Sequence, residues 1–205
     1  MMKKYISKFL IKRGFKTLLK EIGNLNAMDS AETIDFLFSK KAELITPWQF
    51  KEELLQLAKQ IETMKPKIIV EIGTANGGTL FMAARLASTN ALIISIDLPG
   101  GEFGGGYPDW KIPIYKSFAR TNQNIELIRG DSHSDQTFEK LKILLNGREI
   151  DYLFICSPTH MHFRHVIKGL ASGANVILEK PPLLNSENLK KINIYEKKYN
   201  KKCYC

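Results

Sequence analysis

The stretch that decides the fold reads Ile68-Ile69-Val70-Glu71-Ile72-Gly73-Thr74-Ala75-Asn76-Gly77-Gly78. Its first five residues are typical of a buried strand, and its last six form a glycine-rich turn. A second apolar run ends at Asp97, 26 positions after Glu71. A strand, a glycine-rich turn and a second strand that ends in an acid indicate the first half of a nucleoside-binding sheet.

The chain continues to alternate short apolar runs with helical patterns. We expect strands at 67–72, 91–97, 125–129, 152–156 and 175–179, and helices at 78–88, 112–119, 135–145, 160–171 and 186–199. Continuous apolar strands separated by helices indicate a parallel sheet that is covered on both faces. The predicted fold class is therefore α/β, a Rossmann-like doubly wound parallel sheet in three layers.

The first 64 residues follow a helical pattern instead. We expect helices at 3–20, 31–39 and 48–64, with Pro47 at the start of the third. Apolar residues at helical spacing give the third helix a core-facing stripe: Phe50, Leu54, Leu55, Leu57, Ala58 and Ile61. The predicted organisation is a helical amino-terminal extension over 1–64 and a Rossmann-like domain over 65–205.

Charge and cysteine content narrow the function classes. The net charge of +9 is concentrated in residues 1–20 and 187–205, whereas a nucleic-acid groove places its charge on the folded body. We therefore expect no nucleic-acid partner and interpret these lysines as solvated helix faces. No apolar run reaches the length of a bilayer span, and three cysteines indicate reduced thiols. These features predict a cytoplasmic protein.

The first helix allows one further interpretation, a weak contact with an anionic surface. An apolar stripe suits such a contact: Ile6, Phe9, Leu10, Leu18, Leu19 and Ile22. Because this stripe is short and the charge is one-sided, residues 1–20 are expected to be dispensable for folding.

The glycine-rich turn indicates which cofactor would lie over it. It lacks the second glycine of the Gly-x-Gly-x-x-Gly fingerprint, so a pyrophosphate cradle is disfavoured. The turn suits a cofactor without phosphates, with an ammonium group that Glu71 can balance. Asp97 is placed to accept both ribose hydroxyls, and Asp131 to accept from an adenine amino group. Alternatively, both aspartates cap helices.

These residues resemble class I S-adenosylmethionine-dependent methyltransferases, in particular the group allied to cephalosporin hydroxylase and rhamnosyl O-methyltransferase. The resemblance covers about residues 45–155 and implies S-adenosylmethionine as the cofactor. The binding residues that it implies are Glu71, Gly73, Thr74, Gly77, Asp97, Asp131 and Ser132. It also includes the loop from Phe103 to Trp110. The glycine-rich cluster at 101–109 in this loop is interpreted as a lid or as an irregular turn.

A second resemblance covers about residues 151–205. The segments Cys156-Ser157-Pro158-Thr159-His160-Met161-His162 and Glu179-Lys180-Pro181 resemble the Gfo/Idh/MocA oxidoreductases. This resemblance implies that Pro158 and Glu179-Lys180-Pro181 flank a nicotinamide ring, and it makes NAD(P) the alternative cofactor. Methyltransferases of the first group usually carry an Asp-rich segment at 156–159, which is absent here.

We therefore expect a protein that binds S-adenosylmethionine and has weak or no transfer activity toward a small-molecule acceptor. The alternatives are a truncated NAD(P)-binding oxidoreductase domain and a non-catalytic fusion product joined at Asp151–Ile155. Lys180 and His160 are weak catalytic candidates. His162 and His165 share a helical face, but no acid or cysteine joins them at a suitable spacing, so no metal site is expected. A working dehydrogenase is not expected, because the fingerprint and a carboxy-terminal substrate domain are missing from these residues.

Overall fold

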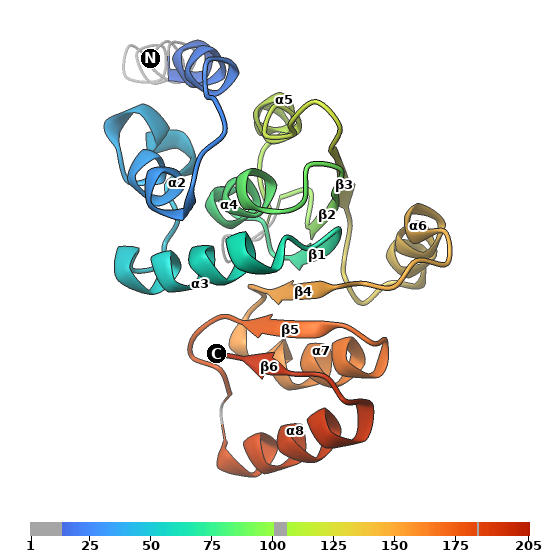
Figure 1. The fold of residues 1–205 in the computed structure, drawn as a ribbon. Helices are drawn as coiled ribbons and strands as arrows, with labels where there is room; N and C mark the ends of the chain where they lie inside the picture. Colours follow the sequence, from blue (N-terminus) through green and yellow to red (C-terminus); the bar gives the residue numbers. More distant parts are fainter. Residues whose placement is uncertain (1–13, 101–105, 184) are drawn as a thin grey trace, which may run out of the picture.

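The computed structural model describes residues 14–100, 106–183 and 185–205. Its centre is a six-stranded parallel sheet in the order β3-β2-β1-β4-β5-β6, as Figure 1 shows. The strands are β1 (Ile68–Ile72), β2 (Leu92–Asp97), β3 (Asn124–Arg129), β4 (Tyr152–Ile155), β5 (Asn175–Leu178) and β6 (Cys203–Tyr204). This confirms the predicted Rossmann-like α/β fold, and it puts the point where strand order reverses between β1 and β4.

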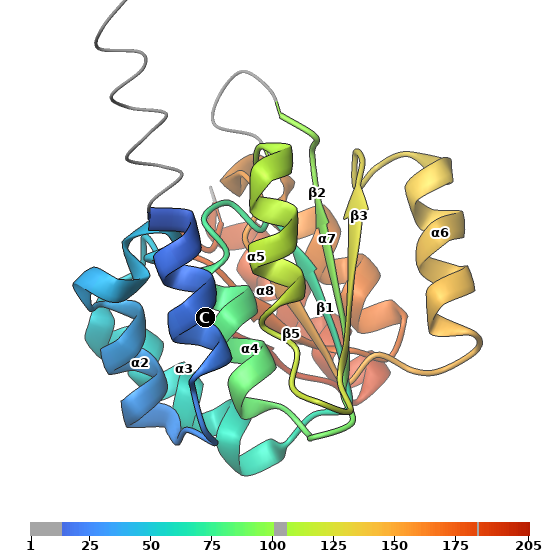
Figure 2. The same ribbon diagram turned by 90° about the horizontal axis from the view of Figure 1, so that it is seen from above.

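Helices cover both faces of the sheet. One layer contains α2 (Ser30–Leu37), the 3-10 helix η1 (Lys40–Ile45), α3 (Lys51–Met64), α4 (Gly78–Leu86), η3 (Asp109–Lys111) and α5 (Ile112–Lys116). The other contains α6 (Asp135–Leu145), α7 (Thr159–Ala171) and α8 (Ser186–Tyr199). Figure 2 shows α2, α4 and α5 on one side of the strands and α6 on the other.

Alternating strand residues build two separate cores. Ile69 and Ile93 point toward the layer of α3 and α4, whereas Val70 and Ile94 point toward the layer of α7 and α8. This alternation follows from the two-residue period of a strand. Because both faces are covered, each strand must be apolar on both sides, which is why the runs in the sequence are continuous.

The expected junction at Asp151–Ile155 lies on the central pair of strands. β4 pairs with β1 in parallel over four residues, from Ile69 opposite Tyr152 to Ile72 opposite Ile155. Just before β4, the Asp151 carboxylate accepts hydrogen bonds from the backbone N–H groups of Lys67 (2.7 Å) and Ile68 (2.9 Å). The start of β1 is thereby fixed to the start of β4, and hydrogen bonding is continuous between these two strands.

Residues 14–23 contribute side chains to the core. In the helical residues 14–23, Leu18 is 1% exposed and Ile22 is 3% exposed, and both belong to the buried cluster that contains Phe81 of α4. The expectation that residues 1–20 are dispensable for folding is contradicted at Leu18, because this side chain is part of the core. Because Leu18 and Ile22 are buried, they are not available for the contact with an anionic surface. The other residues predicted for that contact, Ile6, Phe9 and Leu10, lie outside the described residues.

The third helix begins later than predicted. α3 starts at Lys51 with Phe50 as its N-cap residue, and the Phe50 ring is 70% exposed instead of facing the core. Pro47 is not at the start of this helix. It packs against Gly78, where a Cβ atom would stand 2.8 Å from the proline Cβ. The segment between Pro47 and Lys51 is thus a connection that crosses the start of α4.

No helix in the described part of the chain combines the length and the apolar character needed to cross a membrane.

Candidate functional site

The carboxyl ends of β1 and β2 meet at the glycine-rich turn. Gly73, Ala75 and Gly77 adopt positive φ angles of 94°, 45° and 89°, which fold the chain tightly between β1 and α4. Side chains at two of these positions would overlap the protein: a Cβ at Gly73 would meet the Cys156 carbonyl, and one at Gly77 would meet the Tyr115 ring. Glycine is required here for internal packing and for backbone conformation.

Asp97 holds this turn from the end of β2. One carboxylate oxygen, Oδ2, accepts hydrogen bonds from the backbone N–H groups of Thr74 (2.8 Å) and Ala75 (3.0 Å), and Oδ1 accepts from Leu98 N–H (2.8 Å). Asp97 and the turn therefore lie side by side. However, both oxygens of this carboxylate already accept hydrogen bonds from backbone N–H groups of the same chain.

Glu71 lies beneath the turn and not over it. Its side chain is only 2% exposed, it faces the α4 layer, and the Ser95 hydroxyl donates a hydrogen bond of 2.9 Å to it. Burial raises the pKa of Glu71 to about 7, and the nearby charge of Asp97 acts in the same direction. Glu71 is therefore not presented as an exposed carboxylate that could balance the ammonium of a ligand.

Asp131 and Ser132 lie in the loop between β3 and α6. The Asp131 carboxylate accepts hydrogen bonds from the backbone N–H of His133 (2.9 Å) and faces His133 Nδ1 (3.1 Å). The His133 N–H holds the pKa of Asp131 below its ordinary value. Among the described residues no hydrogen bond joins Asp131 or Ser132 to Asp97.

The histidines after β4 are mainly structural. His162 is 1% exposed and contacts two carbonyl groups, those of Ser157 (2.6 Å) and Pro182 (3.0 Å). His165 stacks on His133 with ring centroids 4.7 Å apart, and burial lowers its pKa to about 4. No cluster of three metal-ligating side chains occurs within residues 14–100, 106–183 and 185–205. His160 is exposed at the start of α7.

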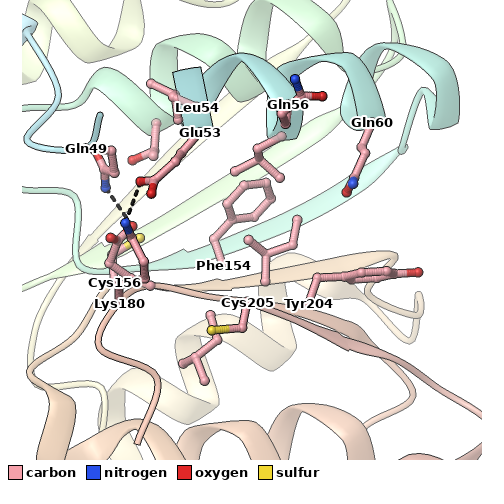
Figure 3. Close-up of a pocket in the computed structure, with 15 residues that line it drawn as sticks. Gln49, Glu53, Leu54, Gln56, Gln60, Phe154, Cys156, Lys180, Tyr204 and Cys205 are labelled. Atoms are coloured by element: carbon pink, nitrogen blue, oxygen red, sulfur yellow. Dashed lines mark hydrogen bonds and ion pairs between the residues drawn. The ribbon is translucent and has the colours of Figure 1, made fainter. Parts of the chain in front are cut away.

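Glu179 and Lys180 follow β5 and contact the start of α3. Gln49 Nε2 donates a hydrogen bond of 2.9 Å to the Glu179 carboxylate, and the Lys180 ammonium forms an ion pair with Glu53. The ammonium also lies 5.3 Å from the centre of the Phe50 ring. Figure 3 shows Gln49, Glu53 and Lys180 converging from the helix and from the sheet.

Two adjoining cavities open at this edge of the sheet. One, of about 280 Å³, lies between the Gly73–Thr79 turn, Pro47 and Lys180. The other, of about 330 Å³, lies between α3 and the row of side chains formed by Phe154, Ile177 and Tyr204 on neighbouring strands (Figure 3). Five residues line both cavities: Gln49, Thr79, Cys156, Glu179 and Lys180. The glycine-rich turn and the Glu179–Lys180 segment thus border one continuous space.

Sequence reasoning missed the residues that contact the glycine-rich turn or the Glu179–Lys180 segment from other elements. Gln49 and Glu53 come from the amino-terminal segment, and no local motif marks them. Lys111 is 7% exposed, its ammonium lies 3.1 Å from Asn76 Oδ1, and burial lowers its pKa to about 8. The Tyr115 hydroxyl donates a hydrogen bond of 2.7 Å to the Ala75 carbonyl. The only signal in the sequence was that Trp110 and Lys111 directly follow the predicted loop at 101–109.

The carboxy-terminal part of the chain is similar to a family of oxidoreductases. Residues 114–205 match the model of the Gfo/Idh/MocA oxidoreductase family, described as an NAD-binding Rossmann fold. The match covers less than half of the chain. It includes the Glu179-Lys180-Pro181 segment, and it begins well before the junction expected at Asp151.

Solved structures agree on the fold. The WlbA (WbpB) dehydrogenase from Thermus thermophilus, in complex with NAD and UDP-GlcNAcA, superimposes with a TM-score of 0.50 at 22% identity over 67% of this chain. The same enzyme in complex with NAD and α-ketoglutarate gives a TM-score of 0.49 at the same identity. This chain spans 40% of the length of that dehydrogenase.

These findings correct the methyltransferase interpretation. The family match includes β3, Asp131 and Ser132, which the sequence analysis had assigned to the methyltransferase half. The buried position of Glu71 removes the acid expected to balance an ammonium group. S-adenosylmethionine binding and methyl transfer are therefore not supported, and the oxidoreductase resemblance is the one that the match upholds.

Proposed function

We infer that this chain is a nicotinamide dinucleotide-binding domain of the oxidoreductase class, with its ligand site at the carboxyl edge between β1 and β4. One observation carries the inference: the Gly73–Gly78 turn and Lys180, far apart in the sequence, line the same cavity. In doubly wound sheets, ligands bind outside the carboxyl ends of the strands at the switch point. The family match of residues 114–205 supports NAD(P) as the ligand.

Asp97 suits the adenosine ribose. Its Oδ1 accepts one hydrogen bond, from Leu98 N–H, and a carboxylate oxygen can accept two. Asp97 can therefore hold the turn and still accept a ribose hydroxyl. An acid at the end of the second strand favours the 2′-hydroxyl of NAD over the 2′-phosphate of NADP, so we expect a preference for NAD.

The pyrophosphate would be held more weakly than in a complete fingerprint, because Thr74 and Ala75 already donate their N–H groups to Asp97. What remains is the first turn of α4, whose N–H groups have no partner within the helix and favour an anion. The Lys111 ammonium adds a positive charge beside Asn76, next to this helix start. The residues present therefore fit a dinucleotide and would bind its phosphates weakly.

Glu179 and Lys180 border the cavity where the nicotinamide end would lie. When bound, the nicotinamide ring supplies a hydride donor or acceptor. The Lys180 ammonium can donate a hydrogen bond to a polar group of a neighbouring molecule, or hold the proton that such a group exchanges. The chain spans 40% of the length of the dehydrogenase that it resembles. We therefore propose oxidoreduction as the class of reaction and name no second substrate.

Titration with NADH, followed by its fluorescence, tests the proposal. We expect saturable binding that Asp97→Ala weakens roughly tenfold, the effect of losing a hydrogen bond to a charged group. Asp135→Ala removes a charge from an exposed position in α6 and serves as the control. Equal affinities for the two variants would show that Asp97 does not contact the ligand, and no binding by the unmodified chain would refute the proposal.

A further inference from the structure

The start of α3 holds the Glu179–Lys180 segment from outside the part of the chain that matches the oxidoreductase family. Glu53 forms the ion pair with Lys180, although 127 residues separate them, and Gln49 donates the hydrogen bond of 2.9 Å to Glu179. The Phe50 ring lies 5.3 Å from the same ammonium. Three residues of one short segment thus contact two consecutive residues after β5, and Figure 3 shows two of them, Gln49 and Glu53, beside Lys180.

These contacts determine where the Lys180 ammonium stands. Lys180 and Gln49 line both cavities, so the ammonium lies where the space beside the glycine-rich turn opens toward the space beneath α3. Glu53 belongs to the second cavity and approaches Lys180 from that side. A ligand in the first cavity would therefore meet a lysine whose position is set by α3.

The energetics favour a role in positioning over a role in stability. The side chains of Lys180 and Glu53 are 47% and 51% exposed, and exposed ion pairs contribute little to folding. A lysine side chain that is free to move must lose rotamer freedom when it contacts a ligand. A partner that restrains it beforehand reduces this cost, so the benefit appears in ligand affinity.

We propose that Glu53 is a positioning residue for Lys180 and that Gln49 has the same role for Glu179, so that the amino-terminal segment completes the nicotinamide end of the site. This inference rests on the proposed function, because Lys180 must contact the dinucleotide for its position to affect affinity. It assigns a role to residues outside the 114–205 family match.

The test is a double-mutant cycle with NADH affinity as the readout. Its variants are Glu53→Gln, Lys180→Ala and the two combined, each compared with Glu52→Gln. Glu52 is exposed and forms no ion pair within the described residues, so its substitution removes the same charge from the neighbouring position. We expect Glu53→Gln to weaken NADH binding about threefold relative to Glu52→Gln. In the Lys180→Ala background this difference should vanish.

Equal effects of Glu53→Gln with and without Lys180 would overturn the inference, as would equal affinities of Glu53→Gln and Glu52→Gln. Exchanging the charges, Glu53→Lys with Lys180→Glu, should leave the melting temperature almost unchanged and should not restore NADH affinity. If the exchanged pair recovered NADH affinity, the ion pair would have only a structural role, and Glu53 would not position Lys180 for the ligand. Should Glu53→Gln fail to fold, Gln49→Ala and Glu179→Gln form the same cycle.

The outcomes also separate this inference from the proposed function. If the unmodified chain does not bind NADH, the proposed function fails and the inference fails with it. If NADH binds but no coupling between Glu53 and Lys180 is found, the inference fails alone.

Discussion

The Glu71 carboxylate accepts a hydrogen bond of 2.9 Å from the Ser95 hydroxyl, directly across the pair formed by β1 and β2. Glu71 is 2% exposed and Ser95 is fully buried. Burial raises the pKa of Glu71 to about 7, whereas an unfolded chain has a glutamate pKa of about 4.3. Such a group contributes stability that is fully present below the unfolded pKa and is lost as pH rises through the folded pKa.

This relationship predicts a pH-dependent difference between the protein and its Glu71→Gln variant. Between about pH 4.3 and pH 7, the free energy of unfolding should fall by on the order of 3 kcal/mol more in the unmodified protein than in the variant. Urea denaturation at a series of pH values measures the difference directly. Parallel pH profiles for the two proteins would mean that Glu71 titrates normally and reaches solvent.

The packing of Gly77 against Tyr115 predicts a large effect of a single methyl group. At φ 89°, Gly77→Ala would strain the backbone and overlap the tyrosine ring, and together these should destabilise the fold by about 2–4 kcal/mol. Gly173→Ala is the matched control, because its φ is 86° and no atom lies within 4 Å of the added Cβ. Thermal unfolding compares them, and equal losses would show that the ring does not occupy this space.

The burial of Leu18 predicts that the amino-terminal helix is needed for stability. Leu18→Ala should destabilise the protein by about 2–5 kcal/mol, since a buried leucine leaves a cavity. Lys16→Ala, on the exposed side of the same helix, should have almost no effect. If Leu18→Ala unfolds at the same urea concentration as Lys16→Ala, residues 14–23 are not part of the core.

The sheet could be predicted from sequence because its signals are local. Continuous apolar runs set the strands, and parallel strands bring their carboxyl ends to one edge, so Asp97 falls beside the turn at Gly73. The start of α3 was misplaced because the expected signal, Pro47, packs on Gly78 instead of beginning a helix.

The site was harder to predict, since its contacts join distant segments. Nothing near Glu53 marks it as the partner of Lys180, and nothing near Tyr115 marks its contact with the Ala75 carbonyl. The motif around Glu71 misled the assignment of the cofactor for a physical reason. The sequence identifies an acid before the turn, but the strand register decides that its side chain points into the α4 layer.

Calorimetric titration of the unmodified chain with NADH, and separately with S-adenosylhomocysteine, tests the central claim most directly. A ligand site formed by the turn, Asp97 and Lys180 predicts one bound NADH per chain, with affinity reduced by both Asp97→Ala and Lys180→Ala. Binding of S-adenosylhomocysteine without binding of NADH would contradict the account.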